Sequence, residues 1–166
     1  MLKAYFLAVF ICFSGYLSAQ TDIDNRHQLV LEKGIIDSAY TFDRSKTGKH
    51  GKEYDILKLT YLGSVTTRHG TTFKVIVSFH TFGTISPHGV SKLVIFNDKN
   101  QFAGSYYVGM PYDLPTKMVN GVLYFNNNVN SDCDKGTRLK LDLKKGLPSQ
   151  FFLPCNGNMG DFYRFD

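Results

Sequence analysis

Histidine side chains offer one kind of chemistry in this sequence, because imidazole can transfer a proton or bind a metal near neutral pH. His80 and His88 flank one predicted loop, and with Asp98 they are the first candidates for a dispersed acid–base site. However, His50, His69 and His88 each precede a glycine in a predicted loop, where an exposed imidazole needs no special role. We therefore predict no metal site and no cofactor.

Tyrosine side chains offer a second kind of chemistry, which is recognition of a partner. Tyr106, Tyr107 and Tyr112 lie around Met110 and Pro111 in the densest aromatic stretch of the chain. Exposed tyrosines beside a proline-ordered loop present a rigid contact area with a hydroxyl group, which suits a protein or sugar ligand. Strand tyrosines that pack across a sheet are the alternative interpretation. The predicted binding residues are Tyr106, Tyr107, Tyr112, His80 and His88.

The N-terminal residues have the three-part pattern of a secretory signal. Lys3 is positively charged, residues 4–13 are mostly apolar, and residues 14–19 are small and polar. A membrane anchor would need about 20 apolar residues, so we predict a signal peptide over residues 1–19 that is cleaved after Ala19. The mature chain is then a single β-rich domain, residues 20–166, that is secreted or periplasmic and has no membrane span.

Two cysteines, Cys133 and Cys155, would remain after Cys12 leaves with the signal. Thiols pair in the oxidising compartments beyond the cytoplasm, so we predict one disulfide, worth about 3 kcal/mol of stability.

Residues 130–136 place oxygen-bearing side chains at alternate positions, as a calcium loop does, but no bidentate glutamate follows them. We therefore interpret them as a polar turn.

The composition favours strands, and the distribution of its charges predicts no nucleic-acid partner. Aromatic residues make up 14% of the chain, all of them Phe or Tyr, and 15 glycines favour turns. The 19 basic and 14 acidic residues give a formal charge of +5, but the basic residues are scattered. Their local cluster at residues 44–52 contains Gly, Ser and Thr, so we interpret it as a solvated loop.

The other elements are predicted around residues 54–108, which we interpret as four antiparallel strands in sequence order. Phe73, Val75 and Val77 alternate with polar residues, the period of a half-buried strand. Gly63 marks a bulge in the first strand, because glycine weakens regular pairing there. The four strands are predicted at residues 54–67, 72–82, 90–96 and 102–108.

Strands are also predicted on both sides of this meander. Asn120 and Gly121 form a two-residue hairpin turn, and a second hairpin brings Cys133 close to Cys155. For residues 24–33, a helix is the alternative prediction to a short strand. The predicted strands are residues 29–31, 35–42, 116–119, 122–125, 137–143, 150–153 and 162–165, and residues 43–52 are a predicted loop.

The predicted fold class is all-β: an antiparallel sandwich or partly closed barrel of about eight to ten strands with one disulfide. We find no motif for a hydrolase nucleophile, a phosphate-binding loop or a zinc protease. Our first hypothesis is a non-enzymatic exported binding or inhibitor-type protein, with another extracytoplasmic protein or a glycan as partner. The alternatives are a β-barrel carrier of a small apolar ligand and an enzyme with dispersed residues around His80 and His88.

Overall fold

The computed structural model describes residues 25–126, 133–134 and 138–166. Within these ranges one α-helix precedes eleven strands, and none of the helices is long and apolar enough to cross a membrane. The elements are α1 (Asn25–Lys33), β1 (Ala39–Asp43), β2 (Lys46–Gly48), β3 (Gly51–Thr66), β4 (Thr72–Gly83), β5 (His88–Asn97), β6 (Phe102–Val108), η1 (Pro111–Asp113), β7 (Lys117–Val119), β8 (Val122–Asn126), β9 (Arg138–Asp142), η3 (Leu143–Lys145), β10 (Gln150–Asn156) and β11 (Met159–Arg164).

Strands β1 to β6 form one antiparallel sheet, the main sheet, in which β3, β4, β5 and β6 pair in sequence order. The predicted four-strand meander is therefore confirmed. The predicted bulge is also present, because the register of β3 on β4 shifts between Tyr61 and Gly63, and Gly63 has a φ of 119°. Strands β1 and β2 both pair with β3, on the edge of the sheet away from β4.

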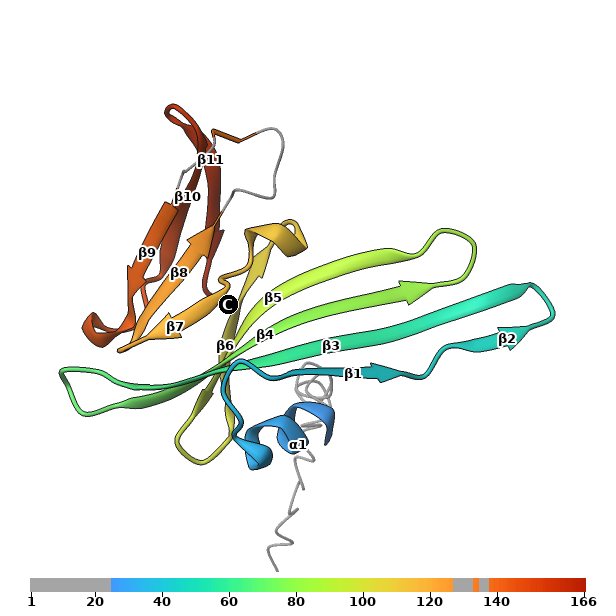
Figure 1. The fold of residues 1–166 in the computed structure, drawn as a ribbon, viewed down its shortest axis with the longest axis horizontal. Coiled ribbons are helices and arrows are strands. Elements are labelled where there is room, and N and C mark those ends of the chain that lie inside the picture. Colours follow the sequence, from blue (N-terminus) through green and yellow to red (C-terminus); the bar gives the residue numbers. More distant parts are fainter. Residues whose placement is uncertain (1–24, 127–132, 135–137) are drawn as a thin grey trace, which may run out of the picture.

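Each face of the main sheet is covered by a different layer (Figure 1). Val75 and Ile76 are adjacent and fully buried, yet they belong to different cores, because consecutive strand residues point to opposite faces. The core facing β7–β11 includes Leu62, Val65, Val75, Leu93, Ile95, Tyr106, Leu123, Phe125, Phe151 and Leu153. The core facing α1 includes Val30, Leu31, Leu57, Leu59, Tyr61, Ile76, Val94 and Phe96. The described strands form an antiparallel, sandwich-like arrangement, and none of their sheets closes into a barrel.

The strands after β6 form two small sheets, and their pairing corrects one prediction. The hairpin of β7 and β8 around Asn120 and Gly121 is confirmed. Strand β9, however, pairs with β8, whereas β10 pairs with β11. The predicted hairpin of residues 137–143 with residues 150–153 is therefore wrong. After β9 the turn η3 ends at Gly146, which has a φ of 113°, so the chain leaves the edge of β9 before β10 begins.

The predicted disulfide is confirmed, although the hairpin expected to close it does not form. Cys133 is bonded to Cys155 of β10, with their Cα atoms 4.5 Å apart. The backbone amide of Asp134 also donates a hydrogen bond to the carbonyl of Cys155, at 2.9 Å. Cys133 is thereby joined to the β10–β11 pair, which we call the C-terminal hairpin.

The N-terminal predictions are partly wrong. Residues 29–31 lie in helix α1, the alternative interpretation, because His27, Val30 and Leu31 share one helical face that is buried against the main sheet. Strand β1 confirms the second half of the predicted strand at residues 35–42. The predicted loop at residues 43–52 contains β2, which is paired with the start of β3 and exposed throughout, so no apolar alternation could have indicated it.

The ends of β2, β3, β4 and β5 extend together beyond β7–β11 as a long arm, and α1 lies at the base of this arm, where Arg26 is 3.5 Å from Asp55 (Figure 1). The arm comprises residues 46–56 and 79–90, and it carries two of the predicted site histidines. Ile85, in the loop at its tip, is 91% exposed.

Candidate functional site

A depression of about 390 Å³ lies between the loop after β6 and the C-terminal hairpin. We call it the acidic–aromatic depression. It is formed mainly by η1 with its flanking residues, by β11, and by the Cys133–Cys155 bridge. Ligand sites usually measure about 300–1,000 Å³, so the depression could hold a small molecule or one side chain of a partner. The residues that matter most to its chemistry are Tyr107, Met110, Tyr112, Asp113, Asp161, Phe162 and Tyr163.

Asp113 is the buried polar group of the depression. Asp113 is only 8% exposed. Its Oδ2 atom accepts hydrogen bonds from the Tyr163 hydroxyl and the Met110 amide, each at 3.2 Å. Burial raises the pKa of the Asp113 carboxyl, and the two hydrogen bonds offset part of this shift. Burial also raises the pKa of Tyr163, and the Asp113 and Asp161 carboxylates add to the rise. Tyr163 therefore remains a proton donor.

The rim of the depression consists of large apolar side chains that are left in solvent. Tyr107 and Met110 are each 52% exposed, and Phe162 is 65% exposed. They come from β6, from the loop before η1 and from β11, so three separate segments converge on one site. Exposed apolar groups that converge around a polar centre are typical of binding sites.

The charges that line the depression are all negative. Asp113 and Asp161 are its charged residues, and no Lys, Arg or His is found among the described residues that line it. The chain as a whole has a formal charge of +5, so the depression is a local exception to the charge of the protein.

The structure separates the three predicted tyrosines. Tyr106 is fully buried, its ring lies 5.2 Å from that of Phe151, and its hydroxyl donates a hydrogen bond to the Pro148 carbonyl at 2.6 Å. Tyr106 therefore packs in the core, in agreement with the alternative interpretation that strand tyrosines pack across a sheet. Tyr107 and Tyr112 both line the depression, so the structure brings these two predicted residues together.

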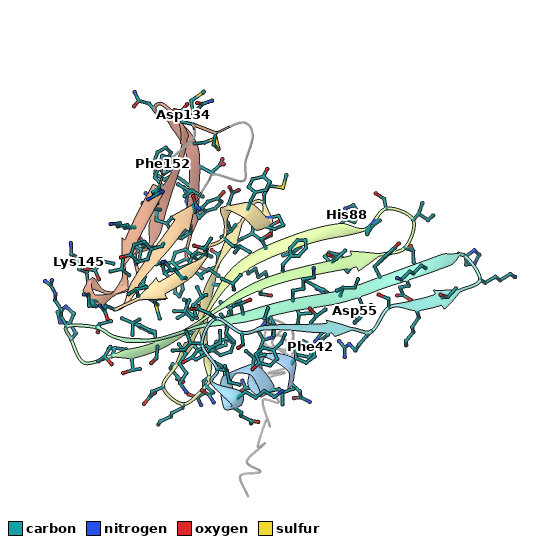
Figure 2. The ribbon with its side chains drawn as sticks, in the orientation of Figure 1. Phe42, Asp55, His88, Asp134, Lys145 and Phe152 are labelled. Atoms are coloured by element: carbon teal, nitrogen blue, oxygen red, sulfur yellow. A yellow bond between two sulfur atoms is a disulfide. The ribbon has the colours of Figure 1, made fainter. Side chains whose placement is uncertain are left out.

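The predicted acid–base trio is not assembled. His88 is at the start of β5 and Asp98 follows its end, which separates them by roughly 30 Å. His80 and His88 are closer, with the ring of Phe82 beside both: its centroid lies 5.2 Å from that of His80 and 6.3 Å from that of His88. Figure 2 shows His88 well along the arm.

His80 interacts instead with Asp55, which lies on the same arm (Figure 2). The His80 Nε2 atom is 2.8 Å from Asp55 Oδ1, and Arg44 Nε is 3.1 Å from Asp55 Oδ2. The hydrogen bond with His80 lowers the pKa of Asp55, and the positive charges of Arg26 and Arg44 add to this shift. Asp55 and its three partners, His80, Arg44 and Arg26, thus form an ion-pair network, the Asp55 cluster, that links the strands to α1. This network accounts for the position of His80 without a catalytic role.

Sequence reasoning missed Asp113, Asp161, Phe162 and Tyr163. Two local signals existed: an acid directly after Tyr112, and the consecutive residues 161–163, an acid and two aromatics. Among the described residues no three His, Cys, Asp or Glu side chains are grouped so that they could hold a metal. The calcium-loop comparison concerned residues 130–136, which lie outside the described residues apart from residues 133 and 134.

Comparison with known proteins gave no match: no family model, no curated protein and no solved structure is significantly similar to this chain.

Proposed function

We propose that this chain is an exported, non-enzymatic binding protein and that the acidic–aromatic depression is its ligand site. The observation that carries the proposal is that the exposed rings of Tyr107 and Phe162 and the half-buried ring of Tyr112 line the depression that contains the buried carboxyl of Asp113. Rings that remain partly in water around a polar centre give a binding protein rigid contact area.

Export is supported by two independent features. The Cys133–Cys155 disulfide is typical of proteins that fold outside the cytoplasm. The sequence of residues 1–19 has the pattern of a cleavable signal, although it lies outside the described residues. Expression in the source cell tests this part of the proposal: the exported protein should begin at Gln20, and a protein that stays in the cytoplasm with residues 1–19 attached would overturn it.

The two alternative functions are favoured less by the geometry. The enzyme hypothesis depended on His80, His88 and Asp98, of which Asp98 is remote from the other two. The carrier hypothesis requires a lumen, but the main sheet is open among the described residues, and large side chains such as Tyr106 and Phe151 fill the space between the layers.

The binding test compares the oxidised exported protein with a double variant, Tyr107→Ala with Phe162→Ala, as bait for the cell envelope and culture medium. The matched control is Ile85→Ala, which also removes an exposed apolar side chain but at the tip of the arm. We expect wild type and the control to retain the same partner and the double variant to lose it, with all three melting within a few degrees of one another. A partner retained equally by the folded double variant, or the absence of both a captured partner and a small-molecule ligand, would overturn the proposed site.

A further inference from the structure

We infer that the acidic–aromatic depression binds an organic cation: an alkylammonium, quaternary ammonium or guanidinium group, carried by a small molecule or by a side chain of a partner protein. This inference rests on the proposed binding function and specifies the chemical class of the ligand. It follows from the charge of the lining residues, from the exposure of their aromatic rings and from the number of carboxylates among them.

The charge of the lining favours a positive ligand. Asp113 lies at the bottom of the depression and Asp161 is on β11, and both carboxylates act on the hydroxyl of Tyr163. No basic side chain among the described lining residues offsets them. An anionic ligand would be repelled by both carboxylates, whereas a cation would supply the neutralising charge that the described lining residues do not.

The aromatic rings of the rim indicate an organic cation in particular. Three other tyrosine rings are covered by lysines of the chain itself: Lys33 lies 5.0 Å from the ring centre of Tyr40, and Lys52 lies 4.8 Å from that of Tyr54. Two further lysines cover Tyr124 in the same way. Within the described part of the chain, no lysine covers Tyr107 or Tyr112. Tyr112 is half-buried, and Lys92 of β5 is the cross-strand partner of Tyr107 without covering its ring. The ring of Tyr107, which is 52% exposed, is therefore the one most open to a cation from outside. Aromatic faces attract alkylated ammonium and guanidinium groups.

A bare metal ion fits the same residues poorly. Calcium takes six to eight oxygen ligands, while the depression offers two carboxylates, and Oδ2 of Asp113 already accepts two hydrogen bonds. A metal ion would also leave the apolar side chain of Met110, which is 52% exposed, without a contact to the ligand. An organic cation places its charge near the carboxylates and its carbon atoms against this side chain.

The experiment titrates the oxidised, isotope-labelled protein with matched probes while the backbone amide signals are followed by NMR. Choline is paired with 3,3-dimethylbutan-1-ol, which has the same shape and no charge. N-acetyl-arginine amide is paired with N-acetyl-norleucine amide. We expect the charged member of at least one pair to bind at least about tenfold more tightly, with the shifts centred on Asp113 and Phe162. Tighter binding of choline would indicate a small-molecule ligand, and tighter binding of the arginine probe would indicate a partner side chain.

Two variants make the test specific. Asp161→Asn removes one exposed lining charge and should weaken cation binding about threefold. Asp98→Asn removes an exposed charge from the turn after β5 and should leave the affinity unchanged. Equal affinity for the neutral probes, or an unchanged affinity in Asp161→Asn, would overturn the inference. Failure of every probe while a partner is still captured through Tyr107 and Phe162 would overturn the cation inference alone and leave the proposed binding function intact.

Discussion

The hydroxyl of Tyr163 lies 3.2 Å from Oδ2 of Asp113, so a buried hydrogen bond joins the C-terminal hairpin to the loop after β6. Fifty residues separate the two partners in the sequence. The bond lies at the base of the depression and holds in place the carboxylate that we assign to ligand binding.

Replacing Tyr163 by Phe tests the contribution of this hydrogen bond. The ring is retained, but Asp113 loses one of its two donors, so we expect the free energy of unfolding to fall by about 1 kcal/mol. The pKa of Asp113 should rise further, because a donor to its charged form is removed. Denaturant unfolding and NMR titration of the carboxyl measure the two effects. Tyr107→Phe, which removes a hydroxyl from an exposed ring, is the matched control and should change neither quantity.

Cation binding should depend on pH through Asp113. Its pKa is raised above the usual 3.8, chiefly by burial, and a cation binds only the ionised carboxyl. As the pH falls through the raised pKa, affinity should therefore decline earlier than for an ordinary aspartate. The other titratable groups that line the depression with Asp113 are Asp161, Tyr163, Tyr107 and Tyr112. Repeating the titration in Asp113→Asn should move the decline in affinity to lower pH, because the carboxyl with the raised pKa is gone while Asp161 remains. A wild-type affinity that is constant from neutral to acidic pH would contradict the assignment.

The meander could be predicted from sequence because it depends on local alternation. Residues such as Val75 and Val77 show which face is buried whatever the neighbouring strand is. Alternation does not identify the neighbour, which is why β9 was paired with the wrong strand. Helix α1 was only the alternative prediction for a related reason: Val30 and Leu31 are too few to distinguish two periodicities, and their burial against the main sheet decides between them.

The candidate site was predictable only in part for the same physical reason. Tyr107 and Tyr112 are near each other in sequence, so composition alone drew attention to them. Asp161 and Tyr163 reach the depression because β11 pairs with β10 and packs against β6. This placement depends on long-range packing, which a single sequence does not reveal.

The disulfide should be a major contributor to stability. Cys133 and Cys155 are 22 residues apart, and closing a loop of that length in the unfolded chain is worth about 3 kcal/mol. A Cys133→Ser, Cys155→Ser double variant should therefore unfold at lower denaturant than the oxidised wild type and resemble the reduced wild type. The bridge also lines the depression, so the double variant should bind the partner less tightly even where it is folded. Equal stability of the oxidised and reduced wild type would contradict this account.

The Asp55 cluster should stabilise the arm in a pH-dependent way. The pKa of Asp55 is lowered in the folded state. The stability that Asp55 contributes is therefore fully present above its unfolded-state pKa of 3.8, and it is lost as the pH falls through the lowered folded-state pKa. The side chain is 30% exposed, so we expect Asp55→Asn to cost no more than about 1 kcal/mol at neutral pH. This difference from wild type should disappear in strong acid. Asp98→Asn is the control, and a difference that persists below the folded-state pKa would show that another interaction is lost.

Gly104 should be essential for docking the C-terminus on β6. A Cβ atom there would overlap the ring of Phe165 and come within 2.7 Å of the Asp166 carbonyl oxygen. That oxygen accepts a hydrogen bond from the Ser105 amide at 2.8 Å, and the Asp166 amide donates to the Ser105 carbonyl at 2.9 Å. We therefore expect Gly104→Ala to displace the C-terminal residues and to lower the free energy of unfolding by about 2–4 kcal/mol.

Gly51→Ala separates this steric effect from backbone strain. Gly51 also has a positive φ, 113° against 148° at Gly104, but nothing lies within 4 Å of the position its Cβ would take. Its replacement should cost about 1 kcal/mol from strain alone. Hydrogen exchange of the Ser105 amide should be accelerated in Gly104→Ala and unchanged in Gly51→Ala. Equal losses of stability in the two variants, with Ser105 still protected, would mean that the C-terminus tolerates the methyl group and that its contact with β6 is looser than the structure implies.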